Sequence, residues 1–187
     1  MRRALTFGPP IALVLALAAV AGCGGGRYGY SRTYSTWGDE GRYYDREVDL
    51  TYEEIRRFPD RHADELLGWF GTVEEIESLD RETGEARLRL QLRPHQERHL
   101  CADETEGSCR VTVAQRPIGP FTVLVTLRPE ELQEGRERLW TGSLLKVYGH
   151  VMDAGDDESG PIIQAEWYRH WPHGFFVTTA ARGSMRR

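Results

Sequence analysis

The chain has 187 residues, with 24 Lys and Arg against 29 Asp and Glu, and a formal net charge of −5. Once an N-terminal signal and a linker are subtracted, this length supports one modest hydrophobic core and gives no indication of a second domain. Affinity for nucleic acid depends on a basic face that contacts phosphates, so the acidic balance argues against a nucleic-acid partner.

The first 22 residues have the parts of a bacterial secretory signal. Arg2 and Arg3 supply positive charge, an apolar run covers residues 10–21, and small residues precede Cys23. The run is too short to span a membrane. The stretch from Val20 to Cys23 resembles the lipobox of bacterial lipoproteins, which implies that Cys23 is the first mature residue and carries diacylglycerol and an acylated amine. The alternative is an ordinary cleaved signal with an incidental cysteine.

Lipid on Cys23 would fix the location of the protein. Each buried methylene contributes about 0.8 kcal/mol, so several acyl chains would make attachment to the membrane effectively permanent. In enteric bacteria an aspartate after the lipidated cysteine retains a lipoprotein in the inner membrane, whereas here Gly24 follows. By analogy we expect the outer membrane, and its periplasmic face rather than the cell surface.

Residues 23–47 are rich in Gly, Tyr, Ser and Arg and contain hardly any aliphatic side chains. Such a composition buries too little apolar surface to order itself, so it predicts a lipidated, flexible tether. The alternative is that its tyrosines stack on glycan or peptidoglycan; these are Tyr28, Tyr30, Tyr34, Tyr43 and Tyr44.

The folded domain is expected over residues 48–174, followed by a C-terminal tail over 175–187. A capping box of Thr51 and Glu54 predicts a short helix to about Arg57, and Asp60 a further turn through Leu66. Alternation of apolar and polar residues, clearest over 86–93, predicts strands. They cover residues 70–76, 86–93, 111–115, 121–127, 143–152 and 162–171, with a helical piece over 130–137 before the last two.

This order of strands around one helix is that of the OB-fold, a five-stranded Greek-key barrel. The expected fold is therefore mainly β, with a small OB-like five-stranded barrel and short helices. A β-sandwich is the alternative, because it has a similar number of strands.

Three segments also resemble the starvation-inducible Slp family of outer-membrane lipoproteins. They are residues 59–73, in which Trp69, Phe70 and Gly71 precede a hydrophobic stretch, residues 144–151, and residues 163–172. The likeness covers about residues 50–172 and implies a lipid-anchored β domain in the outer membrane. The chain departs from that family in its tyrosine-rich linker, a cysteine-bracketed insertion and an extension from Phe175.

Cys101 and Cys109 bracket a polar loop. In an oxidising envelope such a pair forms a disulfide, which would contribute about 2–3 kcal/mol to stability. The alternatives are free thiols or a zinc site that adds His95 and His99, although the spacing lacks a close cysteine pair and Pro94 interrupts any helix.

The end of the last predicted strand carries aromatic and charged side chains. Alternation places Trp167, Arg169 and Trp171 on one face, where they could stack on a glycan or another small ligand. The competing interpretation is that the tryptophans simply close the end of the barrel.

The sequence contains no glycine-flanked nucleophile and no glycine loop that would hold a phosphate. We therefore expect no catalytic residues, no cofactor and no resident metal. The expected function is a structural or interaction module of the cell envelope that is anchored by lipid and has an envelope protein or a glycan as partner. The alternative is a lipoprotein that binds carbohydrate or a small ligand through Trp167, Arg169 and Trp171.

Overall fold

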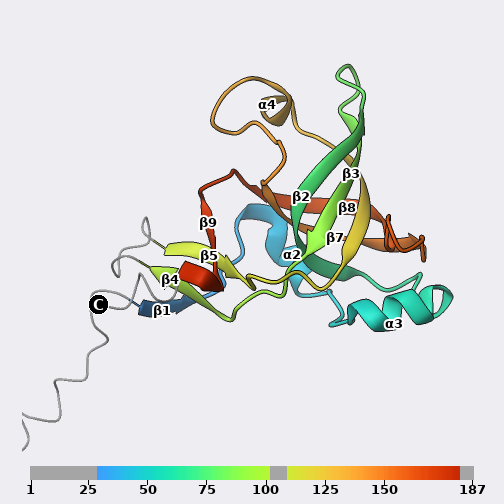
Figure 1. Ribbon diagram of the computed structural model, residues 1–187, viewed down its shortest axis with the longest axis horizontal. Coiled ribbons are helices and arrows are strands. Elements are labelled where there is room, and N and C mark those ends of the chain that lie inside the picture. Colours follow the sequence, from blue (N-terminus) through green and yellow to red (C-terminus); the bar gives the residue numbers. More distant parts are fainter. Residues whose placement is uncertain (1–28, 102–108, 182–187) are drawn as a thin grey trace, which may run out of the picture.

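The computed structural model describes residues 29–101 and 109–181 (Figure 1). Five strands close into a barrel in the order β2-β3-β6-β8-β7. They are β2 (Leu67–Leu79), β3 (Glu85–Leu92), β6 (Pro120–Thr126), β7 (Leu144–Asp153) and β8 (Ile162–Trp171). Within the barrel, β6 and β8 pair in parallel, while the other neighbouring strands are antiparallel. The prediction of an OB-like five-stranded barrel is confirmed.

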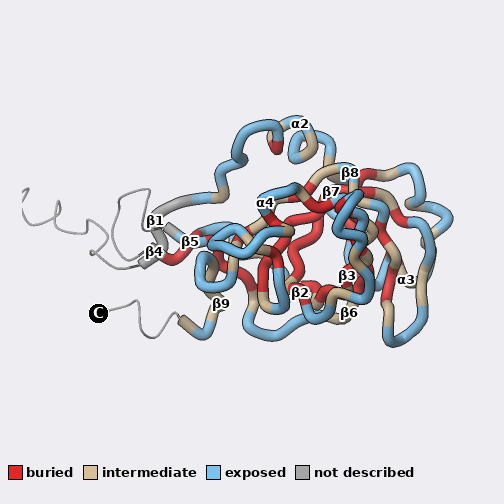
Figure 2. The backbone as a smooth tube through the Cα atoms, turned by 90° about the horizontal axis from the view of Figure 1, so that it is seen from above, coloured by how far each residue is buried: buried red, intermediate tan, exposed pale blue. Residues whose placement is uncertain are grey.

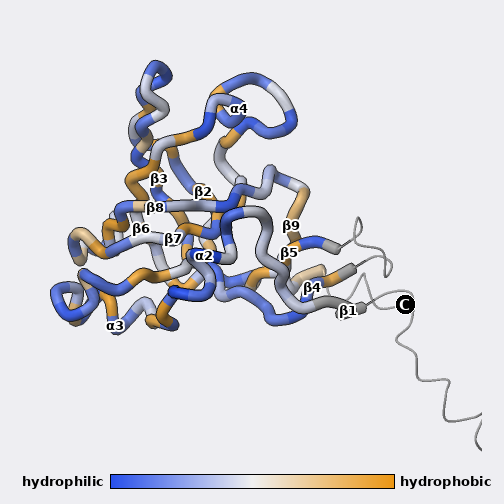
Figure 3. The backbone as a smooth tube through the Cα atoms, turned by 180° about the vertical axis from the view of Figure 1, so that it is seen from behind, coloured by the Kyte–Doolittle hydropathy of each residue, from blue (hydrophilic) through white to orange (hydrophobic). Residues whose placement is uncertain are grey.

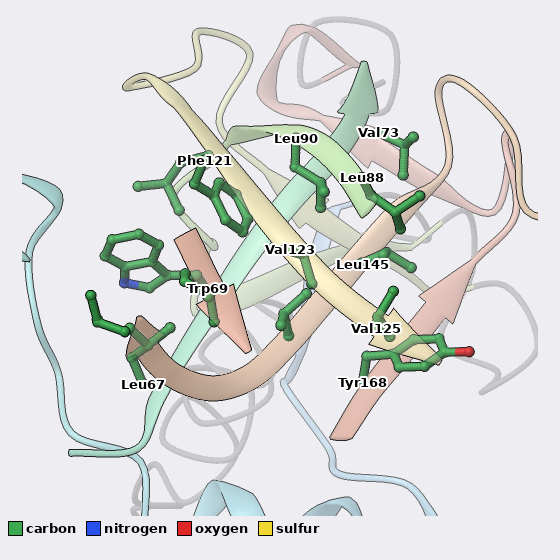
Figure 4. Close-up of a cluster of buried hydrophobic side chains, with 14 of the residues drawn as sticks. Leu67, Trp69, Val73, Leu88, Leu90, Phe121, Val123, Val125, Leu145 and Tyr168 are labelled. Atoms are coloured by element: carbon green, nitrogen blue, oxygen red, sulfur yellow. The ribbon is translucent and has the colours of Figure 1, made fainter. Parts of the chain in front are cut away.

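Alternating side chains fill the barrel. In β3 the residues Leu88, Leu90 and Leu92 are buried, while Arg87 and Arg89 point outward to carboxylates of β2. Figure 4 shows the interior, where Leu88 and Leu90 lie among Phe121, Val123 and Leu145 from the neighbouring strands. In Figure 3 the hydrophobic residues concentrate in the barrel strands, whereas the loop after α4 is mostly hydrophilic.

The helix α3 (Tyr52–Arg57) packs on the barrel, where the ring centroids of Tyr52 and Trp69 lie 6.0 Å apart. The predicted capping box is present, because the Thr51 hydroxyl accepts from the Glu54 amide at 3.3 Å and the Thr51 amide donates to the Glu54 carboxylate at 2.9 Å. Ile55 is fully buried in the main core. The short helix η2 (Pro59–Arg61) follows and is briefer than the expected turn through Leu66.

The helical piece between the third and fourth barrel strands is α4 (Pro129–Leu132). The expectation of a helix reaching residue 137 is wrong, because Gln133 already has an extended backbone and Gly135 has φ +153°. Figure 1 shows α4 at the start of a wide loop that leads into β7.

A second, smaller sheet lies beside the barrel in the order β1-β4-β5-β9. Its strands are β1 (Gly29–Thr33), β4 (Arg98–Cys101), β5 (Cys109–Val113) and β9 (Phe176–Thr178). A second core joins this sheet to the outer face of the barrel, with Val111 and Val113 packed against Phe70, Leu144 and Trp171. The segment from residue 175 is therefore more than a tail, because β9 pairs in parallel with β5 and η4 (Thr179–Ala181) follows it.

Residues 33–47, here named the strap, run across the outside of β7 and β8 and include η1 (Gly38–Glu40) and α2 (Gly41–Tyr44). The expectation of a flexible tether is corrected for this segment, because Glu40 is fully buried and Tyr34 packs on the second core. Figure 2 shows the strap as a mostly exposed arch outside the buried strands. Aromatic and ionic contacts order it despite its lack of aliphatic side chains.

Candidate functional site

The predicted face of β8 is present. Tyr168 points into the main core, while Trp167 and Arg169 lie on the outer face of the barrel. The Arg169 guanidinium lies over the Trp171 ring at 4.5 Å. Trp171 is only 8% exposed and belongs to the second core, whereas Trp167 is half-buried. The competing interpretation, in which the tryptophans are packing residues, therefore fits Trp171 better than Trp167.

Trp167, Arg169 and Trp171 line a hollow of about 320 Å³. Trp37 of the strap also lines it, together with residues of α4, its N-cap and the loop that follows. These are Arg128, Glu130, Glu131 and Glu137. Trp37 is 66% exposed, and the sequence does not indicate its role because it lies in the segment whose composition predicts a tether. The hollow is thus formed by three segments that are distant in the sequence.

A buried carboxylate attaches the strap to the barrel. Glu40 accepts hydrogen bonds from the Tyr148 hydroxyl at 2.9 Å, the Trp37 amide at 2.9 Å and the Arg169 guanidinium at 3.0 Å. It also accepts one from the Tyr34 hydroxyl. Four donors around one buried carboxylate compensate its loss of hydration.

A second attachment involves Lys146, the single lysine of the chain. Its ammonium donates to Glu47 at 3.1 Å, and its side chain is 3% exposed. The rings of Tyr44 and Tyr148 lie 4.4 and 4.5 Å from the ammonium, within the range of cation–π attraction. Burial lowers the pKa of Lys146, although the Glu47 carboxylate opposes that shift.

The strap tyrosines expected as a possible glycan platform stack on other aromatic rings of the protein, although Tyr44 stays 41% exposed. Tyr43 stacks on Trp167 with ring centroids 5.7 Å apart, and Tyr34 stacks on Tyr44 at 5.9 Å. Tyr28 and the side chain of Tyr30 lie outside the described residues.

The lining of the hollow includes a second buried carboxylate, Glu131. Its carboxylate accepts hydrogen bonds from Arg128 at 2.6 Å and from the Tyr168 hydroxyl, and it lies 3.1 Å from Nδ1 of His170. Burial alone would raise the pKa of Glu131, but hydrogen bonds from His170, Arg128 and Tyr168 outweigh it and lower the pKa to about 2. This carboxylate is ionised at neutral pH and is a weak proton acceptor.

The histidines of the metal alternative lie beside the second core. The His95 and His99 rings are 5.5 Å apart, and His95 stacks on Phe70 at 4.7 Å. Burial lowers the pKa of His95 to about 4. Within the described ranges, no group of three or more His, Cys, Asp or Glu side chains is arranged to hold a metal ion.

Cys101 and Cys109 lie directly opposite each other across the β4–β5 pair. Opposed residues of antiparallel strands have Cα atoms about 4.5–5.5 Å apart, a separation that a disulfide can bridge. No disulfide is present among the described side chains, which do not include those of these two cysteines. Their pairing stays a prediction.

Cys23 and the signal segment lie outside the described residues. None of the helices in the described ranges is both long and apolar enough to cross a membrane. Comparison with known sequences finds no matching family model and no matching curated protein. The resemblance to the Slp family therefore stays a prediction.

Proposed function

We propose that this chain is a lipid-anchored protein of the bacterial outer membrane whose OB-like barrel is a non-catalytic structural or interaction module. The stretch from Val20 to Cys23 carries the proposal, because charge, apolar core and small residues agree with a lipoprotein signal. Replacing Cys23 by alanine should move the protein from the membrane to the soluble fraction, while Cys101→Ala should leave it in the membrane. Retention of the Cys23→Ala protein in the membrane would overturn the proposal.

Two features support a non-catalytic role. Glu40 and Glu131, the buried carboxylates near the strap, are both engaged by several donors. A carboxylate with a pKa near 2, as in Glu131, transfers protons poorly at neutral pH.

Cross-linking of the tagged protein in intact cells tests the interaction role. A reproducible partner that is lost on mutating exposed barrel residues supports it, whereas recovery of abundant envelope proteins alone argues against it.

A second candidate function is the binding of a carbohydrate or small ligand at Trp167, Arg169 and Trp171. The observation that favours it is the hollow of about 320 Å³, which combines tryptophan faces with charged groups. Because Trp171 is part of a core, its truncation would confound binding with stability. Trp167→Ala is therefore the better test, with exposed Trp140→Ala as control. Equal glycan retention by both variants would remove this candidate.

A further inference from the structure

A second hollow of about 380 Å³ adjoins the first. Its walls include Tyr34 and Thr36 of the strap and His99 of the small sheet. Trp37, Arg169 and Trp171 line both hollows. The two hollows therefore share one lining residue of the strap and two of β8, and their linings together extend from α4 and the loop after it to the small sheet.

Trp37 is held at this junction by its neighbours in the strap. Its amide donates to the Glu40 carboxylate at 2.9 Å, and Glu40 is itself bonded to Arg169 of β8. Gly38 turns the chain directly after Trp37 with φ +58°, a conformation that side chains rarely adopt. The indole is 66% exposed although its backbone is fixed, so a large aromatic surface faces solvent at a defined place.

Both arginines that line the two hollows are ion-paired, and carboxylates outnumber them. Arg169 is paired with Glu40 at 3.0 Å and Arg128 with Glu131 at 2.6 Å. Glu130 and Glu137 add further carboxylates at the first hollow. Because both guanidinium groups are paired and carboxylates are in excess, this arrangement disfavours an anionic ligand. Aromatic faces with paired ionic groups suit a neutral ligand that has flat apolar sides and many hydroxyl groups.

We infer that the two hollows form one elongated groove that binds a neutral oligosaccharide of two or more sugar units, with Trp37 as the stacking surface shared by both parts. This inference rests on the second candidate function. It adds that the strap completes the site, because Trp37 is the strap residue that lines both hollows, beside Arg169 and Trp171 of β8.

Calorimetric titration of the full-length protein in mild detergent tests the inference, with N-acetylglucosamine and its β-1,4-linked dimer and tetramer as probes. The tetramer should bind at least tenfold more tightly than the monomer. Trp37→Ala should remove that advantage, whereas Trp140→Ala, which changes an exposed indole outside both hollows, should not. Circular dichroism melting should show both variants folded, since each truncates an exposed side chain.

The other outcomes separate the inference from the function on which it rests. Equal affinity for monomer and tetramer, or unchanged tetramer binding by Trp37→Ala, overturns the elongated groove. If Trp167→Ala still abolishes binding in that case, the single-hollow ligand site survives. Absence of binding to any of the three sugars overturns both the groove and the glycan-binding candidate.

Discussion

Replacing Glu40 by glutamine should release the strap from the barrel. The Glu40 side chain is 0% exposed and accepts from the Trp37 amide, the Arg169 guanidinium and the Tyr148 hydroxyl. A glutamine side chain has one acceptor oxygen and introduces an amide donor into a site that already contains only donors. The substitution also leaves the charge of Arg169, which is 22% exposed, without its partner.

Breaking a buried ion pair by removing one partner costs about 3–5 kcal/mol. In a domain of this size a destabilisation of about 1 kcal/mol lowers Tm by roughly 2–4 °C. If the strap and the barrel unfold as one cooperative unit, the substitution should therefore lower Tm by at least about 6 °C. The strap can instead detach locally, which lets water reach Arg169 and limits the loss to the contacts of the strap.

Hydrogen exchange followed by mass spectrometry distinguishes these cases. The amides of Asp45 and Glu47, which donate to Gly41 and Tyr43 within the strap, should lose protection in Glu40→Gln, while amides of β3 keep theirs. The matched control is Asp39→Asn, because Asp39 is exposed and paired with exposed Arg42, so its loss should cost under about 1 kcal/mol. Unchanged strap protection together with a Tm shift below about 2 °C in Glu40→Gln would refute the role of Glu40.

Three further predictions concern acid, a turn and the cysteines. The pKa of His95 is lowered from 6.5 to about 4, so as the pH falls the unfolded chain binds the proton before the folded chain does. The stability present above pH 6.5 should therefore fall as the pH drops toward 4. The Tm of His95→Phe should depend less steeply on pH in that window. Gly160→Ala should unfold at clearly lower denaturant than Gly174→Ala, because a Cβ at Gly160 would lie 1.7 Å from a backbone carbonyl oxygen while Gly174 has open space; equal midpoints would contradict this. Cys101 and Cys109 should resist alkylation until a reductant is added, and the reduced protein should lose about 2–3 kcal/mol of stability, whereas immediate labelling of both would exclude the disulfide.

Patterns of neighbouring residues in the sequence are sufficient to predict strands of the barrel and the helix α3. The alternation of Leu88 and Leu90 with arginines identifies β3, and the pairing of Thr51 with Glu54 identifies the start of α3. Both signals depend on residues within a few positions of each other, so they can be read along the chain.

The strap and the small sheet depend on partners far away in the sequence. Glu40 bonds to Arg169, 129 positions later, and nothing in the composition of residues 33–47 shows that such a partner exists. The three residues of β9 are too few for a periodic signal and become a strand only by pairing with β5. Trp37 was missed for the same reason, whereas Trp167 and Arg169 were found from the alternation of β8.

The intact mass of the protein extracted from membranes of its bacterial host tests the central claim most directly. The account predicts a mature chain that begins at Cys23 and carries the mass of a diacylglyceryl group and an additional acyl chain on that residue. A chain of unmodified mass, or one whose N-terminus lies at another residue, would contradict the lipid anchor and with it the proposed function.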